Sequence, residues 1–331
     1  MKNVRTVLEI DCVHNNGVTG ENIGVAILDT GIFLHDDFLK PFYRVVAFKD
    51  FVNKKVEPYD DNGHGTHVAG ICGGSGYSSK GIYKGVAPKC NLIIEKVLDS
   101  YGIGSVEYVE EALLWTIDNM KKYGIHIVNL SIGSYGGNSS DINRLLDVVE
   151  YAWDKGLVVL TAAGNKGPKA GSITEPGTCK KIITVGTMEE YIYFTRNGKS
   201  VRGFSGCGPT KENIVKPEVV APGCNIISCN NGKGYVSKSG TSMATPVVSG
   251  IVALGLEAFY KKPFYEKDNH NKENYDKGYI YHKNILIRKN NINKQIKKAL
   301  FETSYDLRKE KNKQGWGLIN AQGMVRNISK Y

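Results

Sequence analysis

Three short stretches carry residue types that together could perform nucleophilic catalysis. They are Asp29-Thr30-Gly31, His64-Gly65-Thr66-His67-Val68-Ala69-Gly70 and Gly240-Thr241-Ser242-Met243-Ala244-Thr245-Pro246. A serine hydroxyl is a poor nucleophile at neutral pH and needs an adjacent base, for which histidine has a suitable pKa. A carboxylate beside that histidine fixes its tautomer and stabilises the imidazolium. We therefore predict that Ser242 attacks a carbonyl, His64 moves the proton and Asp29 orients His64.

A fourth stretch, Ala162-Ala163-Gly164-Asn165, follows an apolar run and offers a side-chain amide. Acyl transfer places negative charge on the carbonyl oxygen, and losing one donor to that oxygen typically costs roughly 3–4 kcal/mol. Asn165 and the N–H of Ser242, at the start of a helix, are the expected donors. The simpler alternative is that Asn165 only forms a turn before Gly167 and that the catalytic candidates are polar turn residues beside strands.

Apolar, β-branched runs must hold these residues in place. Such runs predict buried strands at 23–28, 92–94, 125–130, 157–160 and 182–185. Their near-continuous apolar character suits a parallel sheet that is covered on both faces. Apolar residues at three- and four-residue spacing predict helices over 105–123 and 141–155, the second capped by Ser139 or Ser140.

The expected fold class is therefore α/β: a doubly wound, mostly parallel sheet with helices on both faces. In such folds, active sites form at the carboxyl ends of the strands, where the four stretches fall.

After about residue 200 the pattern changes to short segments broken by Gly and Pro. Short strands are expected at 204–208, 219–223, 226–229 and 234–236, followed by an apolar helix from near Ser242 and a last, basic helix over 292–303. We expect one catalytic domain over residues 1–331. It would comprise an N-terminal extension at 1–22, a basic surface insertion at 260–290 and a C-terminal helix with a closing segment at 291–331.

The formal net charge of +10 on 331 residues is concentrated in one segment. Residues 261–300 contain eleven Lys or Arg against four Asp or Glu, so the remaining chain is nearly neutral and no nucleic-acid partner is expected. A solvated basic face is the default interpretation of 261–300, and an anionic partner is the alternative. A hydrophobic fraction of 41% argues against disorder. No run reaches the roughly 18 apolar residues of a membrane span, so no transmembrane segment is expected.

Seven cysteines are present without a C-x-x-C pair, and the first residues do not form a signal peptide. An odd number of thiols without an export signal favours a reducing compartment, so we expect a cytoplasmic protein. The alternative is a secreted chain that has lost its signal by processing, in which case Cys224 and Cys229 could pair.

The catalytic stretches, in the order Asp, His, Ser, resemble those of subtilisin-family serine proteases. The resemblance covers about residues 20–257 and returns at Gly315-Trp316-Gly317-Leu318-Ile319-Asn320-Ala321. The stretches 48–53, 59–63 and 83–88 are especially similar to intracellular subtilisin-like proteases of Gram-positive bacteria. The resemblance implies a serine endopeptidase that acts through an acyl-enzyme. A catalytically weak or regulatory protease-like binding protein is the alternative.

The resemblance also implies where a polypeptide substrate would bind. The substrate would add as a strand between two edges of the protein, a mode that tolerates many sequences. These edges would be Gly102, Ile103 and Gly104 on one side and Ser131, Ile132 and Gly133 on the other. Ala163 and Gly164 would line the pocket for the residue before the cut. Lys166 falls near the rim of that pocket, so a basic residue before the cut is expected to be disfavoured.

No cofactor and no metal ligand are expected. The loop 74–84 lacks the Asn-rich spacing that holds a structural calcium in secreted relatives, and only Asp37 matches a carboxylate of that site. One ligand makes a poor oxygen cage for calcium, so a weak structural calcium site is the alternative. His67 lies three residues after His64, whereas paired metal ligands on a helix are usually four apart, so His67 is expected to be structural. Val247 stands where the family usually has histidine.

Overall fold

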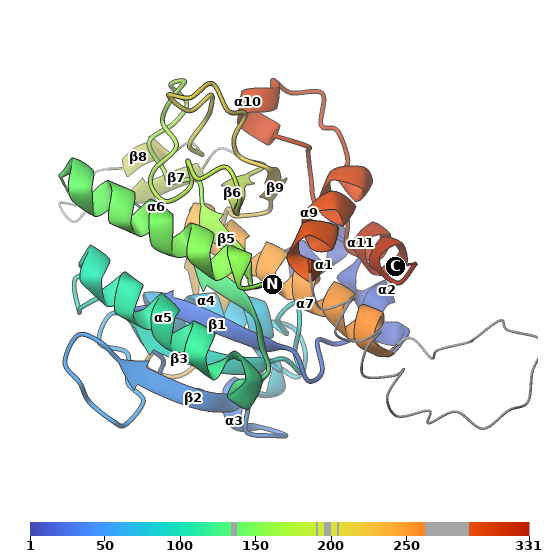
Figure 1. The fold of residues 1–331 in the computed structure, drawn as a ribbon. Coiled ribbons are helices and arrows are strands. Elements are labelled where there is room, and N and C mark those ends of the chain that lie inside the picture. The colour runs from blue at the N-terminus through green and yellow to red at the C-terminus, as the bar shows by residue number, and fades with distance from the viewer. Residues whose placement is uncertain (134–137, 190, 195–199, 204, 262–290, 331) are drawn as a thin grey trace, which may run out of the picture.

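A seven-stranded, entirely parallel sheet forms the centre of the computed structural model, which describes residues 1–133, 138–189, 191–194, 200–203, 205–261 and 291–330. The strand order is β2-β3-β1-β4-β5-β6-β9 (Figure 1). The strands are β1 (Gly24–Asp29), β2 (Val45–Asp50), β3 (Asn91–Lys96), β4 (Ile125–Leu130), β5 (Val158–Ala162), β6 (Ile183–Thr187) and β9 (Val219–Ala221). The five long strands predicted from apolar runs are all present, within two residues at each end.

The edge strand β2 was missed because it lacks the pattern of a buried strand. Both of its ends are buried, but Val46 and Lys49 are exposed. A strand at the edge of a sheet has only one neighbour, so its sequence need not be continuously apolar.

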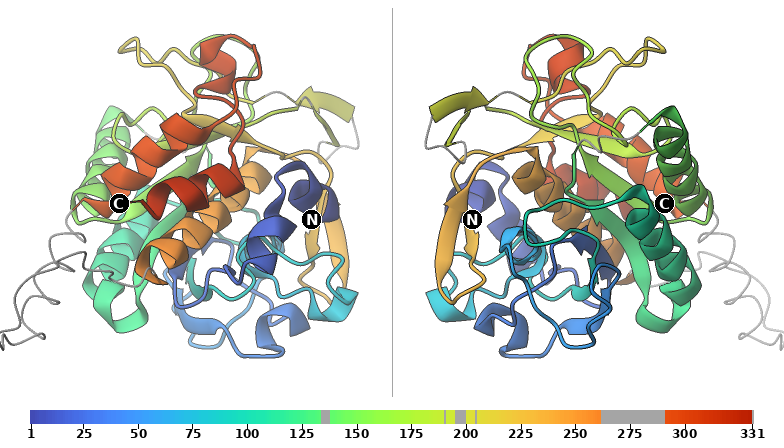
Figure 2. Two further views of the ribbon diagram at one scale, coloured as in Figure 1. Left: turned by 90° about the vertical axis from the view of Figure 1, so that its right-hand side faces the viewer. Right: turned by 90° about the vertical axis from the view of Figure 1, so that its left-hand side faces the viewer.

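Helices cover both faces of the sheet, as expected (Figures 1 and 2). Helices α5 (Val106–Tyr123) and α6 (Ser139–Asp154) lie on one face, and α4 (His64–Gly73) and α7 (Thr241–Lys261) lie on the other. The prediction of the α6 cap was wrong: Asn138, not Ser139 or Ser140, accepts the hydrogen bond from the Asp141 N–H. Gly124 ends α5 with a φ of 62°, a left-handed conformation that glycine adopts readily.

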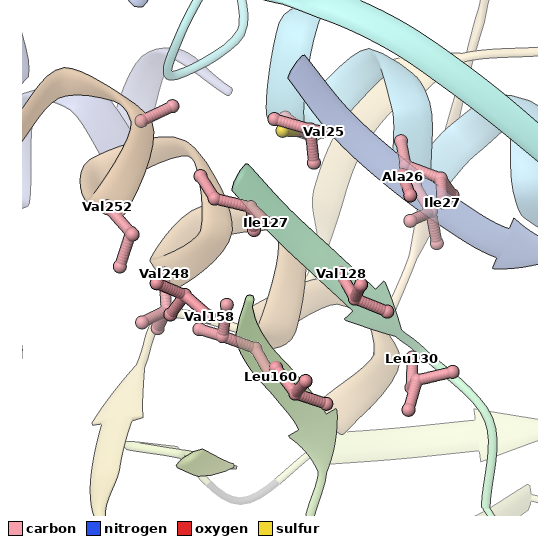
Figure 3. Close-up of a cluster of buried hydrophobic side chains, with 14 of the residues drawn as sticks. Val25, Ala26, Ile27, Ile127, Val128, Leu130, Val158, Leu160, Val248 and Val252 are labelled. Atoms are coloured by element: carbon pink, nitrogen blue, oxygen red, sulfur yellow. The ribbon is translucent and has the colours of Figure 1, made fainter. Parts of the chain in front are cut away.

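The core lies between the sheet and its helices, where strands β1, β4 and β5 meet α7. Figure 3 shows aliphatic side chains from all four elements packed together, among them Val25, Ile127, Leu160 and Val248. The α7 helix is long and apolar enough to cross a membrane, but 89% of its apolar window is buried inside the protein. The core helix of a globular fold passes the same test.

Both ends of the chain form further helices that pack beside those covering the sheet. The N-terminal segment forms α1 (Lys2–Val7) and α2 (Ile10–Asn15), two helices that the sequence pattern did not predict. Arg5 of α1 is buried, and its guanidinium donates to the carbonyls of Gly81, Ile82 and Lys84. The N-terminal segment therefore holds the loop around residues 76–85 in place through these hydrogen bonds.

The C-terminal segment forms α9 (Ile292–Thr303), at the predicted residues. The expectation that this helix is the last was wrong, because α10 (Lys311–Gln314) and α11 (Ala321–Ile328) follow it. Helix α11 packs closely on α7: a Cβ added at Gly255 of α7 would lie 3.1 Å from Cε of Met324.

Short elements complete the fold. They are α3 (Asp36–Leu39), the 3-10 turn η1 (Tyr77–Ser79), the antiparallel pair β7 (Tyr191–Phe194) and β8 (Ser200–Gly203), and the antiparallel pair β10 (Ile226–Cys229) and β11 (Tyr235–Lys238). The strand predicted at 204–208 does not form over the described residues 205–208. Of the basic insertion predicted at 260–290, residues 260 and 261 belong to α7, and residues 262–290 lie outside the described residues.

Candidate active site

Asp29 and His64 form the centre of the site. Asp29 ends β1, is fully buried and accepts a hydrogen bond at Oδ1 from the Thr30 N–H. The same oxygen lies 2.7 Å from Nδ1 of His64, the first residue of α4. A carboxylate at this distance favours the tautomer with the proton on Nδ1, which leaves Nε2 as a base. The His64 side chain is 26% exposed, so substrate can reach it.

Asp60 shapes the turn that carries His64. Its carboxylate accepts hydrogen bonds from the Thr30 hydroxyl, the Gly63 N–H, and both the N–H and hydroxyl of Thr66. Burial alone would raise the pKa of Asp60, but these hydrogen bonds outweigh it and lower that pKa. The turn after β1 and the start of α4 are thereby tied to one ionised carboxylate.

The glycine after His64 permits the close approach of α4 to β1. A Cβ at Gly65 would lie 2.3 Å from the Gly31 carbonyl oxygen and 3.2 Å from Cβ of Asp29. Contacts this short are not tolerated, so any other residue at position 65 would push His64 away from Asp29.

Ser242 is the second residue of α7 and lies two residues after Gly240, whose φ is 145°. The Ser242 hydroxyl donates to the carbonyl oxygen of Ser131 at 2.9 Å. Within the described part of the chain, no hydrogen bond joins Ser242 to His64. Catalytic hydrogen bonds are often long or poorly aligned before substrate binds.

Asn165 lies beside the turn that leads to Ser242. Its Oδ1 accepts hydrogen bonds from the N–H and the hydroxyl of Thr241, at 3.2 and 3.0 Å. A Cβ at Gly240 would lie 3.5 Å from Nδ2 of Asn165. These two hydrogen bonds from Thr241 fix the Asn165 amide beside Gly240.

A cleft of 640 Å³ runs past His64. It is lined by Thr30, Asn62, His64, Leu98, Tyr101, Gly102, Ile103, Gly104, Ser105, Val106, Glu107, Ser131, Ile132, Gly133 and Asp141. The structure thus brings both predicted substrate edges to one cavity. Ala163, Gly164, Asn165 and Ser242 are outside this lining, but a Cβ at Gly133 would lie only 3.8 Å from Cα of Gly164.

Several cleft residues were missed by sequence reasoning. Glu107 and Asp141 lie in the first turns of α5 and α6, where acidic residues are common because they favour the positive end of the helix dipole. Because this pattern is common, it did not indicate that Glu107 and Asp141 line a cleft. Tyr101, which is 67% exposed, directly precedes the predicted edge and could have been added to it from sequence adjacency.

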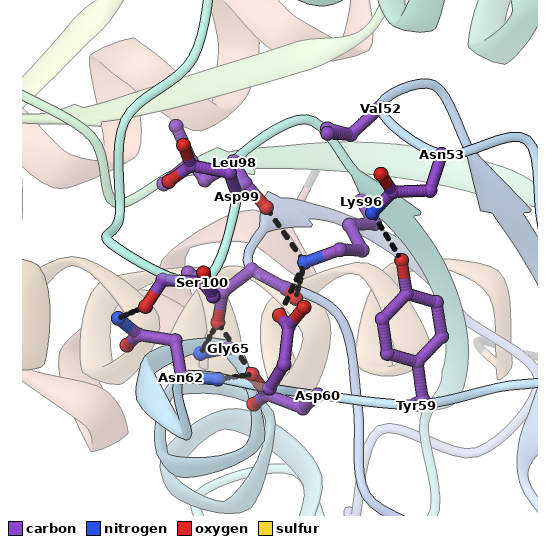
Figure 4. A network of polar contacts seen from close by, with 12 residues as sticks. Val52, Asn53, Tyr59, Asp60, Asn62, Gly65, Lys96, Leu98, Asp99 and Ser100 are labelled. Atoms are coloured by element: carbon purple, nitrogen blue, oxygen red, sulfur yellow. Dashed lines mark hydrogen bonds and ion pairs between the residues drawn. The ribbon is translucent and has the colours of Figure 1, made fainter.

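A buried lysine that was also missed connects the segments around the site (Figure 4). Lys96 ends β3 opposite Asp29 in the sheet register and is fully buried. Its Nζ donates to the carbonyls of Thr30 and Leu98 and to the Asp61 carboxylate, at 2.7, 2.8 and 2.8 Å. Lys96 therefore joins the turn after Asp29, the turn before His64 and the segment that leads to the 102–104 edge.

The described residues contain one cluster whose donor atoms could hold a metal ion. Atoms of His35, Asp37 and Cys229 all lie within 4.8 Å of one another and are buried. The Asp37 carboxylate, however, already accepts hydrogen bonds from the Gly76 and Ser78 N–H groups and from the Tyr235 hydroxyl. Nδ1 of His35 accepts the Asp37 N–H. The donor set is satisfied internally and fits a hydrogen-bonded core better than a metal cage.

Comparisons with known proteins show the family of this chain. Residues 20–317 match the subtilase family. The chain is 42% identical over 259 residues to serine protease AprX of Bacillus subtilis, covering 72% of this chain and 57% of the relative. It is 36% identical over 247 residues to Subtilisin Savinase of Lederbergia lenta, covering 75% and 81% of the two chains.

Among solved structures, a cold adapted subtilisin-like serine proteinase superposes with a TM-score of 0.57 at 32% identity, covering 72% of this chain and 77% of that one. The matched part spans little more than half the length of AprX. This chain belongs to the subtilase family.

Proposed function

We propose that the protein is a serine endopeptidase that hydrolyses peptide bonds through an acyl-enzyme. The observation that carries this proposal is the 2.7 Å pair between buried Asp29 and His64 at the wall of a cleft that both substrate edges line. Membership of the subtilase family supports the same activity. Asp29, His64 and Ser242 are all present, so the sequence gives no reason to prefer a purely regulatory role.

In the proposed first step, Ser242 leaves the Ser131 carbonyl and turns toward Nε2 of His64. His64 takes the hydroxyl proton as the oxygen attacks the substrate carbonyl, and Asp29 stabilises the imidazolium that results. His64 then gives this proton to the leaving amine. Water attacks the acyl-enzyme in the same way, which releases the acid and restores Ser242.

Two donors are proposed for the oxyanion. The Nδ2 group of Asn165 is one, because its partner oxygen is already held by Thr241. The Ser242 N–H at the start of α7 is the other, since the first N–H groups of a helix have no partner within it.

These steps use side chains, one backbone N–H group and water, so we propose that activity requires no metal or cofactor. We further propose a reducing, cytoplasmic environment, because all seven cysteines carry free thiols and five of them are buried.

The test is hydrolysis of casein by the purified chain and by Ser242→Ala. We expect the variant to lose activity by at least about 10³-fold and to keep its circular dichroism spectrum. The control Ser329→Ala, in a serine beyond the end of α11, should keep the wild-type rate. Equal rates for Ser242→Ala and the wild type would overturn the proposal.

A further inference from the structure

We propose that a groove between α6, α9 and the C-terminal segment, remote from the cleft, binds an acidic polypeptide segment that carries an aromatic or aliphatic anchor residue. The groove has a volume of 570 Å³. Its lining consists of three aromatic residues and five lysines: Trp153, Phe301, Trp316, Lys180, Lys181, Lys294, Lys297 and Lys298.

The aromatic residues form an apolar floor. Phe301 and Trp316 meet edge to face with ring centroids 5.5 Å apart, and Phe301 is 61% exposed. Trp153 is almost fully buried and closes the floor from the end of α6. Concave apolar surface with exposed aromatic rings is typical of sites that take up an anchoring side chain.

Three of the lysines at the rim are already used within the fold. Lys297 donates to the carbonyls of Lys180, Lys181 and Ile182 and pairs with Glu218 at 3.0 Å. Lys181 pairs with Glu150 and Asp154, and Lys298 pairs with Glu302. These contacts fix the positions of the three lysines and compensate their charges, so these lysines contribute little to the attraction of an anionic ligand.

Lys180 and Lys294 differ from the other three. Over the described ranges, no carboxylate lies within ion-pair distance of either ammonium group, and both residues are exposed. Two uncompensated positive charges beside an apolar floor are complementary to carboxylates that flank an apolar side chain.

The shape and the number of charges favour a peptide over other anions. A membrane surface is broad and would not fill a concavity of this size, and duplex nucleic acid is usually held by more phosphate contacts than two lysines can supply. An apolar anchor with acidic neighbours satisfies the floor and the rim together.

The groove and the cleft share no lining residue. Asp141 near the start of α6 lines the cleft, and Trp153 near its end lines the groove. Twelve residues of helix separate them by about 18 Å. Figure 1 shows the end of α6 beside α9, where the Asn293 side chain donates to the Trp153 carbonyl. A segment docked there would tether its polypeptide and raise the local concentration of the rest of that chain.

The experiment measures peptide binding by Ser242→Ala protein, which prevents cleavage, using tryptophan fluorescence and calorimetry. The probe is the blocked peptide Asp-Glu-Phe-Glu-Asp, compared with Lys-Lys-Phe-Lys-Lys and Asp-Glu-Ala-Glu-Asp. We expect the first peptide to bind at least about tenfold more tightly than either comparison peptide, because it alone has both the charge and the anchor.

Lys180→Glu combined with Lys294→Glu should weaken binding of the acidic peptide by about tenfold or more, and Phe301→Ser should do so independently. The matched control combines Lys121→Glu with Lys122→Glu, which makes the same charge change on exposed residues at the end of α5. Equal binding by the groove variants and the control would overturn the proposal. So would tighter binding of phosphatidylglycerol vesicles or of an oligonucleotide than of the acidic peptide. Phe301→Ser alone decides the matter if the charge reversal prevents folding.

Discussion

Lys96→Met tests whether one buried ammonium organises the active site. The substitution keeps most of the side-chain volume but removes all three donors of Nζ. The carbonyls of Thr30 and Leu98 are then left without that partner in a buried environment, at a typical cost of about 1–3 kcal/mol each. Asp61 is partly exposed and can be hydrated, so the loss of its ion pair with Lys96 adds little to the destabilisation. We therefore expect the free energy of unfolding to fall by roughly 2–6 kcal/mol.

The same substitution should slow catalysis, because Thr30 follows Asp29 and Leu98 begins the segment that leads to the 102–104 edge. A displacement of about 1 Å at reacting groups can reduce the rate by about 10²-fold. Urea unfolding gives the stability and a fluorogenic peptide gives kcat/KM, with the exposed neighbour substitution Lys49→Met as the control. A free energy of unfolding within about 0.5 kcal/mol of the wild type, the range of ordinary surface changes, would refute the reasoning.

Three further predictions address catalysis, pH dependence and metal dependence. Asp29→Asn should lower kcat by about 10⁴-fold with little change in Tm, because the amide favours the wrong His64 tautomer; a kcat within tenfold of the wild type would contradict this. Burial lowers the pKa of His67 to about 3, whereas in the unfolded chain it is about 6.5. As the pH falls below 6.5 the unfolded state therefore binds a proton that the native state does not, and stability should fall by about 1.4 kcal/mol per pH unit until about pH 3. Urea titrations at pH 7 and 5 should show a flatter dependence in His67→Asn, and an equal slope would contradict the assignment. Chelation by EDTA should leave Tm unchanged, because the Arg5 guanidinium, and not a calcium ion, binds the carbonyls of the loop around residues 76–85. Arg5→Ala should lower Tm for the same reason. A loss of Tm in EDTA that calcium restores would contradict this.

The parts of the fold that could be predicted are those where one stretch of sequence determines its own environment. The strand at 125–130 is mostly apolar and ends where Ser131 meets the cleft, so its burial and its end are both encoded locally. The helix predicted over 105–123 from the spacing of its apolar residues likewise depends on a local pattern, and it forms as α5. The family resemblance predicted that 102–104 and 131–133 flank one site, and the structure brings both segments to one cleft.

The features that escaped prediction depend on residues far apart in the sequence. Nothing near Lys96 indicates that its ammonium will meet carbonyls at positions 30 and 98 and a carboxylate at 61. The aromatic floor joins Trp153 to Phe301 and Trp316 only after α6 and α9 have packed together. Local pattern carries no information about such contacts, which arise from packing.

The most direct test of the proposed catalytic assignment is covalent labelling with a serine-directed fluorophosphonate, followed by intact-mass and peptide mapping. We predict a single adduct on the peptide that contains Ser242, no adduct in Ser242→Ala, and much slower labelling in His64→Ala, since the hydroxyl then lacks its base. Absence of labelling in the wild-type protein, or an adduct on a different serine, would contradict the account.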